Sequence, residues 1–142
     1  MKMGRNHRDA ESETACDELI DAAAIEIQAC WESTRRGPFG KQQVLQSIYD
    51  AYRKWPTAQL DGIRARLGDR LNYRSPERYA LLRLLIEVAL PHVESQVANL
   101  WVDAIKYGEA HHVRPQKLRG FLYHRGGLVR CAQMFRENEC PR

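Results

Sequence analysis

The sequence predicts an all-α protein, a single-domain bundle of six or seven helices around a buried central helix at about residues 76–90, with a C-terminal helical hairpin. Apolar residues recur at helical spacing along most of the 142 residues, and no strand-like alternation continues for more than a few residues. Residues 75–107 also combine a helix start signal, a nearly continuous apolar run and a proline in mid-course. A chain of this length buries about 68–70 % of its unfolded surface, so one core is enough without a disulfide or a metal.

The first helix is expected to follow a disordered N-terminal arm, residues 1–9, and to open at Asp9 or Ser12. It is expected to close after the basic residues 35–36, where a glycine and Pro38 follow. Cysteine on an apolar stripe packs as a small hydrophobe, so two cysteines count toward the buried face of this helix. That face consists of Cys16, Leu19, Ile20, Ala23, Ile27, Cys30 and Trp31.

Two shorter helices are expected next. One runs from about Lys41 to Trp55, where Pro56 stops it. Thr57 then caps the following helix, in which Gly68 is a weak point because glycine lowers helix stability. Their apolar stripes comprise Val44, Leu45, Ile48, Tyr49 and Tyr52 on the first, and Leu60, Ile63, Leu67 and Leu71 on the second.

The central helix is expected to begin at Pro76, which suits a first helical position because no N–H is needed there. Ser75 can cap the first backbone N–H groups, and Glu77 lies at the positive end of the helix dipole. Along the following turns only Arg83 and Glu87 are charged, and they lie four residues apart. One narrow stripe therefore meets water, and the rest of the helix must be covered by other helices.

Pro91 interrupts this apolar run. Proline lacks a backbone donor and disfavours a helical residue before it, so we expect the central helix to end at Leu90 and a new helix to begin beyond it. The new helix is amphipathic, with Val93, Val97, Leu100, Trp101, Ala104 and Ile105 on its apolar face. We therefore expect residues 10–110 to form the helical bundle.

The C-terminal segment, residues 111–138, is expected to form a basic helical hairpin that can act as a subdomain, followed by a tail at 139–142. Pro115 opens its first helix, and Gly126 and Gly127 supply the left-handed turn that ends it. The apolar residues are Leu118, Phe121 and Leu122 on the first helix, and Leu128, Cys131, Ala132 and Phe135 on the second.

Charge alternates along the chain. The sequence has 22 Lys and Arg against 18 Asp and Glu, a formal net charge of +4. Residues 38–75 carry 7 basic against 3 acidic residues and residues 111–142 carry 7 against 2, whereas 1–37 and 76–110 are acidic. Two basic segments that met on one face would favour a polyanionic or acidic partner.

The C-terminal hairpin has the outline of a helix-turn-helix, so nucleic acid is the leading partner and a regulatory role the leading function. Lys117, Arg119 and Arg125 are expected to contact a phosphate backbone, and Tyr123 to stack on a base. An outward arginine and glutamine on the second helix can read guanine and adenine edges, whereas Glu137 would repel phosphate. The remaining candidates are Arg130 and Gln133 on that helix, and Arg66 and Arg70 on one flank of an earlier helix.

The alternative function is a protein-binding adaptor or inhibitor that uses the acidic first helix or an apolar groove. Asp17, Glu18 and Asp21 are its candidate contacts. A homodimer would double either surface, and the mass of the native protein tests for it. A simpler interpretation competes with both functions: the charged side chains only face water and bind no partner.

An enzyme that depends on a metal or on acid–base chemistry is the third and least favoured function, and no cofactor or metal is expected. His111, His112 and His124 are metal-ligand types, but their separations match no zinc signature, and no nucleophile or oxyanion motif accompanies them. The N-terminus has no hydrophobic secretory signal and no apolar run is long enough to span a membrane, so the expected location is cytoplasmic. The four cysteines, including Cys140, are then expected to be free thiols.

Overall fold

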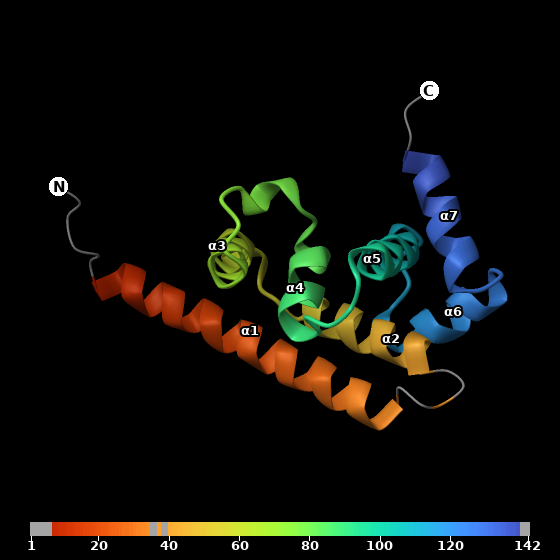
Figure 1. Ribbon diagram of the computed structural model, residues 1–142, viewed down its shortest axis with the longest axis horizontal. Helices are drawn as coiled ribbons and strands as arrows, with labels where there is room; N and C mark the ends of the chain where they lie inside the picture. Colours follow the sequence, from red (N-terminus) through yellow and green to blue (C-terminus); the bar gives the residue numbers. More distant parts are fainter. Residues whose placement is uncertain (1–6, 35–36, 38–39, 140–142) are drawn as a thin grey trace.

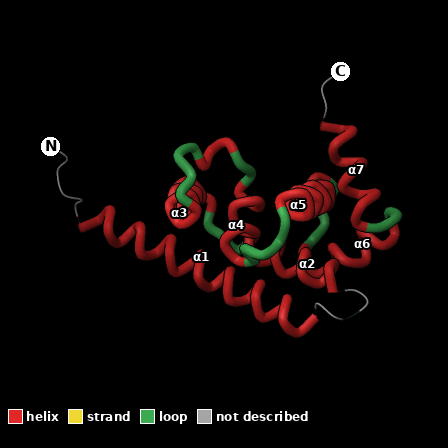
Figure 2. The backbone as a smooth tube through the Cα atoms, viewed as in Figure 1, coloured by secondary structure: helices red, strands yellow, loops and turns green. Residues whose placement is uncertain are grey.

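The computed structural model describes residues 7–34, 37 and 40–139. Within these residues the chain forms seven α-helices and no strand, which confirms the predicted all-α fold (Figure 1, Figure 2). Short 3₁₀ turns at Thr57–Gln59, Pro76–Arg78 and Pro115–Lys117 lead toward the third, fourth and sixth helices. The helices are α1 (His7–Thr34), α2 (Gly40–Arg53), α3 (Leu60–Leu71), α4 (Leu81–Ala89), α5 (Ser95–Ala110), α6 (Leu118–His124) and α7 (Leu128–Glu139).

Helix α4 lies at the centre of the bundle, between α3 and α5 and against α1 and α2 (Figure 1). Its side chains Leu82, Leu85 and Ile86 are almost completely buried, as is Trp101 of α5. They belong to one hydrophobic core, to which every α-helix contributes, and the predicted stripes of α1, α2, α3 and α5 face this core. The prediction of a buried central helix inside a coat of other helices is therefore confirmed.

The α-helical part of the central segment begins later than predicted. The chain makes a 3₁₀ turn at Pro76–Arg78, the next two residues are extended, and α4 begins only at Leu81. Ser75 makes no capping hydrogen bond through its side chain. The local start signal at residues 75–77 therefore produces one turn and not the helix itself.

Tertiary contacts keep residues 76–80 out of the α-helix. Arg64 donates hydrogen bonds to the backbone carbonyls of Pro76 and Tyr79. The ring of Tyr79 stacks on the ring of Tyr73, with centroids 4.8 Å apart, and the Tyr73 hydroxyl donates to Glu87 of α4 at 2.7 Å. These contacts come from outside the segment, so its own residues do not reveal them.

The break predicted at Pro91 is confirmed. Helix α4 ends at Ala89, the N–H of Leu90 donates to the carbonyl of Ile86 at 2.8 Å, and α5 starts at Ser95. Thr57 was expected to cap the third helix, but it is the first residue of the 3₁₀ turn that leads into α3. That turn continues directly into α3, which has no side-chain cap.

Gly68, predicted as a weak point of its helix, is a packing position of α3. A Cβ atom at residue 68 would lie 2.7 Å from both the Cβ and the Cγ of Pro76. The proline ring is rigid and cannot move aside as the end of a flexible side chain can. Glycine therefore allows the 3₁₀ turn at Pro76 to lie directly against α3.

The predicted C-terminal pair of helices is present, and each helix packs on the bundle. Helix α6 lies on α2, and α7 lies on α5 (Figure 1). Leu118, Leu122 and Cys131 are buried in the common core, so this segment shares its core with the rest of the chain. Gly126 and Gly127 link the two helices with φ angles of +103° and +100°, which is the left-handed turn predicted.

Some expectations lie outside the described residues. They concern residues 1–6 of the N-terminal arm, the closure of the first helix at residues 35–36 and Pro38, and Cys140 in the tail. Helix α1 already begins at His7, before its predicted start. No helix in the part of the chain that the structure describes is both long and apolar enough to pass through a membrane.

Candidate nucleic-acid interface

Helix α6 presents to solvent a surface that carries several of the predicted nucleic-acid contacts. Leu118 and Leu122, one helical turn apart, are buried in the common core, and Arg119 and Gly120 between them are exposed. Tyr123 is 68 % exposed, although tyrosine is usually at least partly covered. We call this surface the α6 face; its exposed residues are Gln116, Lys117, Arg119, Gly120, Tyr123 and His124.

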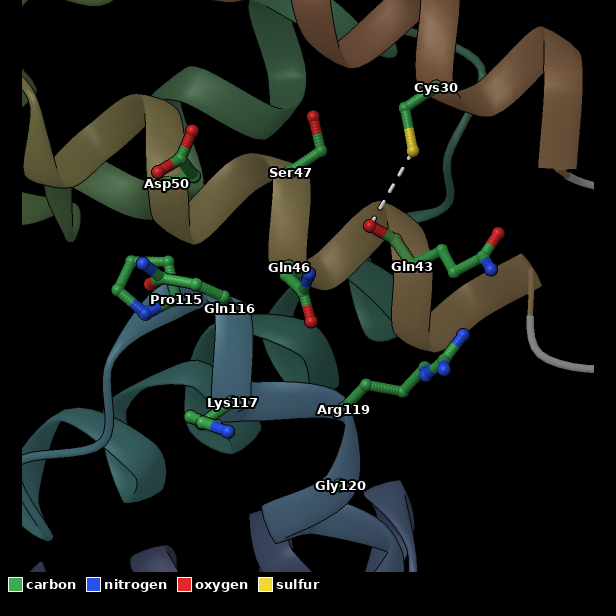
Figure 3. A pocket seen from close by; sticks show the side chains of 10 residues that line it. All are labelled: Cys30, Gln43, Gln46, Ser47, Asp50, Pro115, Gln116, Lys117, Arg119 and Gly120. Carbon is green, nitrogen blue, oxygen red and sulfur yellow. Dashed lines mark hydrogen bonds between the residues drawn. The ribbon is translucent and has the colours of Figure 1, made fainter.

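An open groove of about 760 Å³ lies beside the α6 face and is also lined by α2 and by Cys30 near the end of α1. Figure 3 shows Gln46 pointing from α2 toward α6, and Arg119 extending from α6 toward the first turns of α2. The amides of Gln43 and Gln46 supply both donors and acceptors to this α2–α6 groove. The carboxylate at its edge, Asp50, is held by Lys54 at 3.1 Å.

Two further hollows border α6. One, of about 250 Å³, is lined by Gln42, Arg119, Gly120 and Tyr123. Gly120 lines three spaces: this hollow, the α2–α6 groove and the second hollow, which is described next. We call the second, of about 580 Å³, the histidine hollow, and its polar lining consists of His111, His112, Arg114, Lys117 and His124.

The loop beneath the histidine hollow is tethered to the bundle. The hydroxyl of Tyr49 donates to the carbonyl of Val113 at 2.6 Å, and burial raises the pKa of Tyr49, so this hydroxyl keeps its proton. His111 packs on the rings of Tyr107 and Phe121, with centroids 4.6 and 5.5 Å away. Among the described residues, no group of three His, Cys, Asp or Glu side chains is placed to hold a metal ion.

Arg125, Arg130 and Gln133 lie beyond the α6 face. Arg125 lies over the ring of Phe121, 5.0 Å from its centroid, and donates to the hydroxyl of Tyr107 at 3.4 Å. Arg130 and Gln133 are exposed on α7 and are not among the residues that line the hollows around α6. The structure therefore places Lys117 and Arg119 on the α2–α6 groove and Tyr123 on the hollow of about 250 Å³ beside it, and leaves Arg130 and Gln133 on a separate helix.

Arg66 and Arg70 are bound within the fold. Arg66 donates through Nε and Nη2 to the two carboxylate oxygens of Asp17, each at 3.1 Å. Arg70 donates to Asp21 at 2.9 Å and to Asp17 at 3.3 Å. Two predicted nucleic-acid contacts on α3 thus pair with two predicted protein contacts on α1, while Glu18 remains exposed. We call these four paired residues the α1–α3 ion-pair cluster.

We expect Asp17→Asn to lower the free energy of unfolding by about 1–2 kcal/mol at neutral pH. The hydrogen bonds from Arg66 hold the pKa of Asp17 below its ordinary value, so the folded protein binds this proton less readily than the unfolded chain. The stabilisation is therefore complete above the ordinary carboxyl pKa and is lost as the pH falls through the lower, folded value. Urea unfolding of both proteins over the acid range measures the difference, which should shrink as the pH falls.

Glu18→Gln is the matched control for this prediction, because Glu18 is exposed on the same turn of α1. We expect that substitution to change the free energy of unfolding by less than about 0.5 kcal/mol. Equal stability of Asp17→Asn and the wild type at neutral pH would show that the α1–α3 ion-pair cluster does not stabilise the fold.

Comparison of the chain with protein-family models, with curated proteins and with solved structures finds no match. Function is therefore inferred from the residues of this chain alone. The α6 face and the α2–α6 groove form a region where exposure, positive charge and hydrogen-bonding groups coincide.

The amides of α2 and Gly120 are residues of this region that the sequence prediction missed. Gln42, Gln43 and Gln46 fall outside the apolar stripe of α2, so a helical projection of that segment places them together. A Cβ at residue 120 would meet no atom within 4 Å. Glycine in a helix interior nevertheless costs about 0.5–1 kcal/mol relative to alanine. A glycine inside a predicted helix that also carries Lys117 and Arg119 was the signal available in the sequence.

Proposed function

We propose that this protein binds nucleic acid through the α6 face, as a regulatory binding protein that needs no cofactor. The observation that carries the proposal is the charge around that face. No Asp or Glu occurs between Glu109 and Glu137, whereas this stretch contains Arg114, Lys117, Arg119 and further basic residues. A phosphate backbone lying on α6 would therefore meet cations without a carboxylate from the same segment.

The same region carries groups that suit bases. Tyr123 is exposed and offers a ring for stacking. Arg119 and the amides of Gln43 and Gln46 line the adjoining groove and match the donors and acceptors of base edges. Phosphate-binding and base-binding groups within one region favour nucleic acid over an acidic protein as the partner.

A protein-binding adaptor or inhibitor is the second candidate. It would use the exposed side of α1, where Ile25 is 65 % exposed and Glu18 also reaches solvent. Asp17 and Asp21 already pair with arginines of α3, which reduces the acidic surface that this candidate needs. Nucleic acid is therefore favoured over a protein as the binding partner.

Fluorescence anisotropy with labelled single-stranded RNA, single-stranded DNA and duplex DNA tests the proposal. We expect binding at about 50 mM salt, with log K falling linearly against log salt at a slope of about −2, as for three phosphate contacts. If none of the three nucleic acids binds under these conditions, the proposal is wrong. A purified protein partner whose binding is lost on Glu18→Lys would instead support the second candidate.

A further inference from the structure

We infer that a single-stranded nucleic acid crosses α6 directly over Gly120 and places one base in the α2–α6 groove. This path rests on the proposed function and adds two things to it, the form of the nucleic acid and the point of closest approach. Gly120 is the third residue of α6 and lines the groove and both hollows around that helix. It is therefore the position at which a strand would come nearest to the helix backbone.

Packing explains three other helical glycines but not Gly120. A Cβ at Gly62, Gly68 or Gly108 would lie 2.9, 2.7 or 2.5 Å from a neighbouring side-chain atom, so each of these sites is tight. At Gly120 a Cβ would meet nothing within 4 Å, and its backbone has no positive φ that requires glycine. The absent side chain instead opens the helix backbone to a molecule from outside, which is one of the uses of glycine at binding sites.

Gly120 and Lys117 each line both the histidine hollow and the α2–α6 groove, and the other polar groups of these two spaces differ. Arg114 and Lys117 line the histidine hollow and are suited to hold a phosphate. The α2–α6 groove presents the amides of Gln43 and Gln46, which are suited to a base. A strand with its phosphate in the first space and its base in the second must lie over Gly120, where a side chain would obstruct it.

The position of the base-binding groups favours a single strand over a duplex. Gln43 and Gln46 are half-buried in a groove between two helices and do not stand out from the surface. The bases of a duplex stay stacked and are read by an element that enters the duplex groove, whereas an unpaired base can turn outward into a cavity. The groove volume of about 760 Å³ lies within the range of pockets that hold small ligands. Tyr123 then offers a ring for a neighbouring base.

Gly120→Ala tests the point of closest approach, because stability and binding should change in opposite directions. Alanine favours the helix and fills open space, so the Tm should rise by about 2–4 °C. The added methyl group stands in the path of the strand, so the affinity for a single-stranded oligonucleotide should fall about tenfold. Thermal unfolding followed by circular dichroism and fluorescence anisotropy measure the two effects. A more stable variant that binds as tightly as the wild type would overturn the inference.

Gly68→Ala is the matched control, since it makes the same substitution in a helix that does not border the groove. Its Cβ would lie 2.7 Å from the ring of Pro76, so the Tm should fall. Its affinity, measured at a temperature where the variant is folded, should equal that of the wild type. Absence of binding by the wild type would contradict the proposed function itself, whereas wild-type binding that Gly120→Ala leaves intact contradicts only the path over α6.

Gln46→Ala tests whether a base enters the groove. We expect the relative affinities for oligo(A), oligo(C) and oligo(U) to change by about fivefold, because an amide that reads a base edge is removed. The salt slope should stay the same, because no charge is removed. Unchanged base preference would contradict the placement of the base. A duplex that binds the wild type as tightly as a single strand would contradict the choice of a single strand.

Discussion

Replacing Leu85 with alanine is expected to lower the free energy of unfolding by about 3 kcal/mol. Leu85 is completely buried and lies on α4, the helix that packs against α1, α2, α3 and α5. The substitution removes the transfer free energy of the lost methyl and methylene groups and leaves a cavity that the surrounding helices close only in part. Urea unfolding followed by circular dichroism gives the free energy, and the slope with denaturant should not change.

Ile25→Ala is the control for Leu85→Ala, because Ile25 is 65 % exposed on α1. We expect this exposed substitution to change the free energy of unfolding by less than about 0.5 kcal/mol. Similar effects of the two substitutions would mean that α4 is not the buried centre of the bundle.

The largest effect on binding is expected from Arg114→Gln, Lys117→Gln and Arg119→Gln combined. These residues line the hollows around α6, and their substitution removes three positive charges from one region. Since each phosphate contact with a single strand contributes about −0.7 to the slope of log K against log salt, that slope should become less steep by about 2. The affinity at about 50 mM salt should fall on the order of a hundredfold. Anisotropy titrations at several salt concentrations measure both quantities.

Arg74→Gln with Arg78→Gln is the matched control for this loss of charge. Both residues are exposed between α3 and α4, and Figure 1 shows that connection well away from α6. We expect the control to leave the salt slope almost unchanged. If each charge removed there lowers the slope as much as each charge removed at α6, binding is a property of the whole surface and the α6 face is not the site.

The bundle could be predicted because each helix is marked by its own residues. The apolar stripe from Cys16 to Trp31 predicts α1, and Pro91 predicts the end of α4, without reference to any other part of the chain. The start of α4 could not be predicted in this way. Arg64 and Tyr73, which lie outside residues 76–80, make the contacts that keep those residues out of the α-helix. Gly68 is a similar case, since its role depends on Pro76 lying against it.

The candidate site was predicted in part. Lys117, Arg119 and Tyr123 could be selected because an exposed basic and aromatic helix face follows from the apolar stripe opposite it. The pairing of Arg66 with Asp17 could not be predicted, because it depends on how α3 packs on α1. The alternation of acidic and basic segments nevertheless contained a signal, since two oppositely charged helices in one bundle attract each other as readily as they attract a partner.

NMR titration of the ¹⁵N-labelled protein with a single-stranded oligonucleotide tests the α6 face as the binding site most directly. The largest amide shifts should fall at residues 114–124 and 42–47, with the amide of Gly120 among them. The amides of residues 13–21 on α1 should stay unchanged. Shifts confined to α1, or spread evenly over the molecule, would contradict the site.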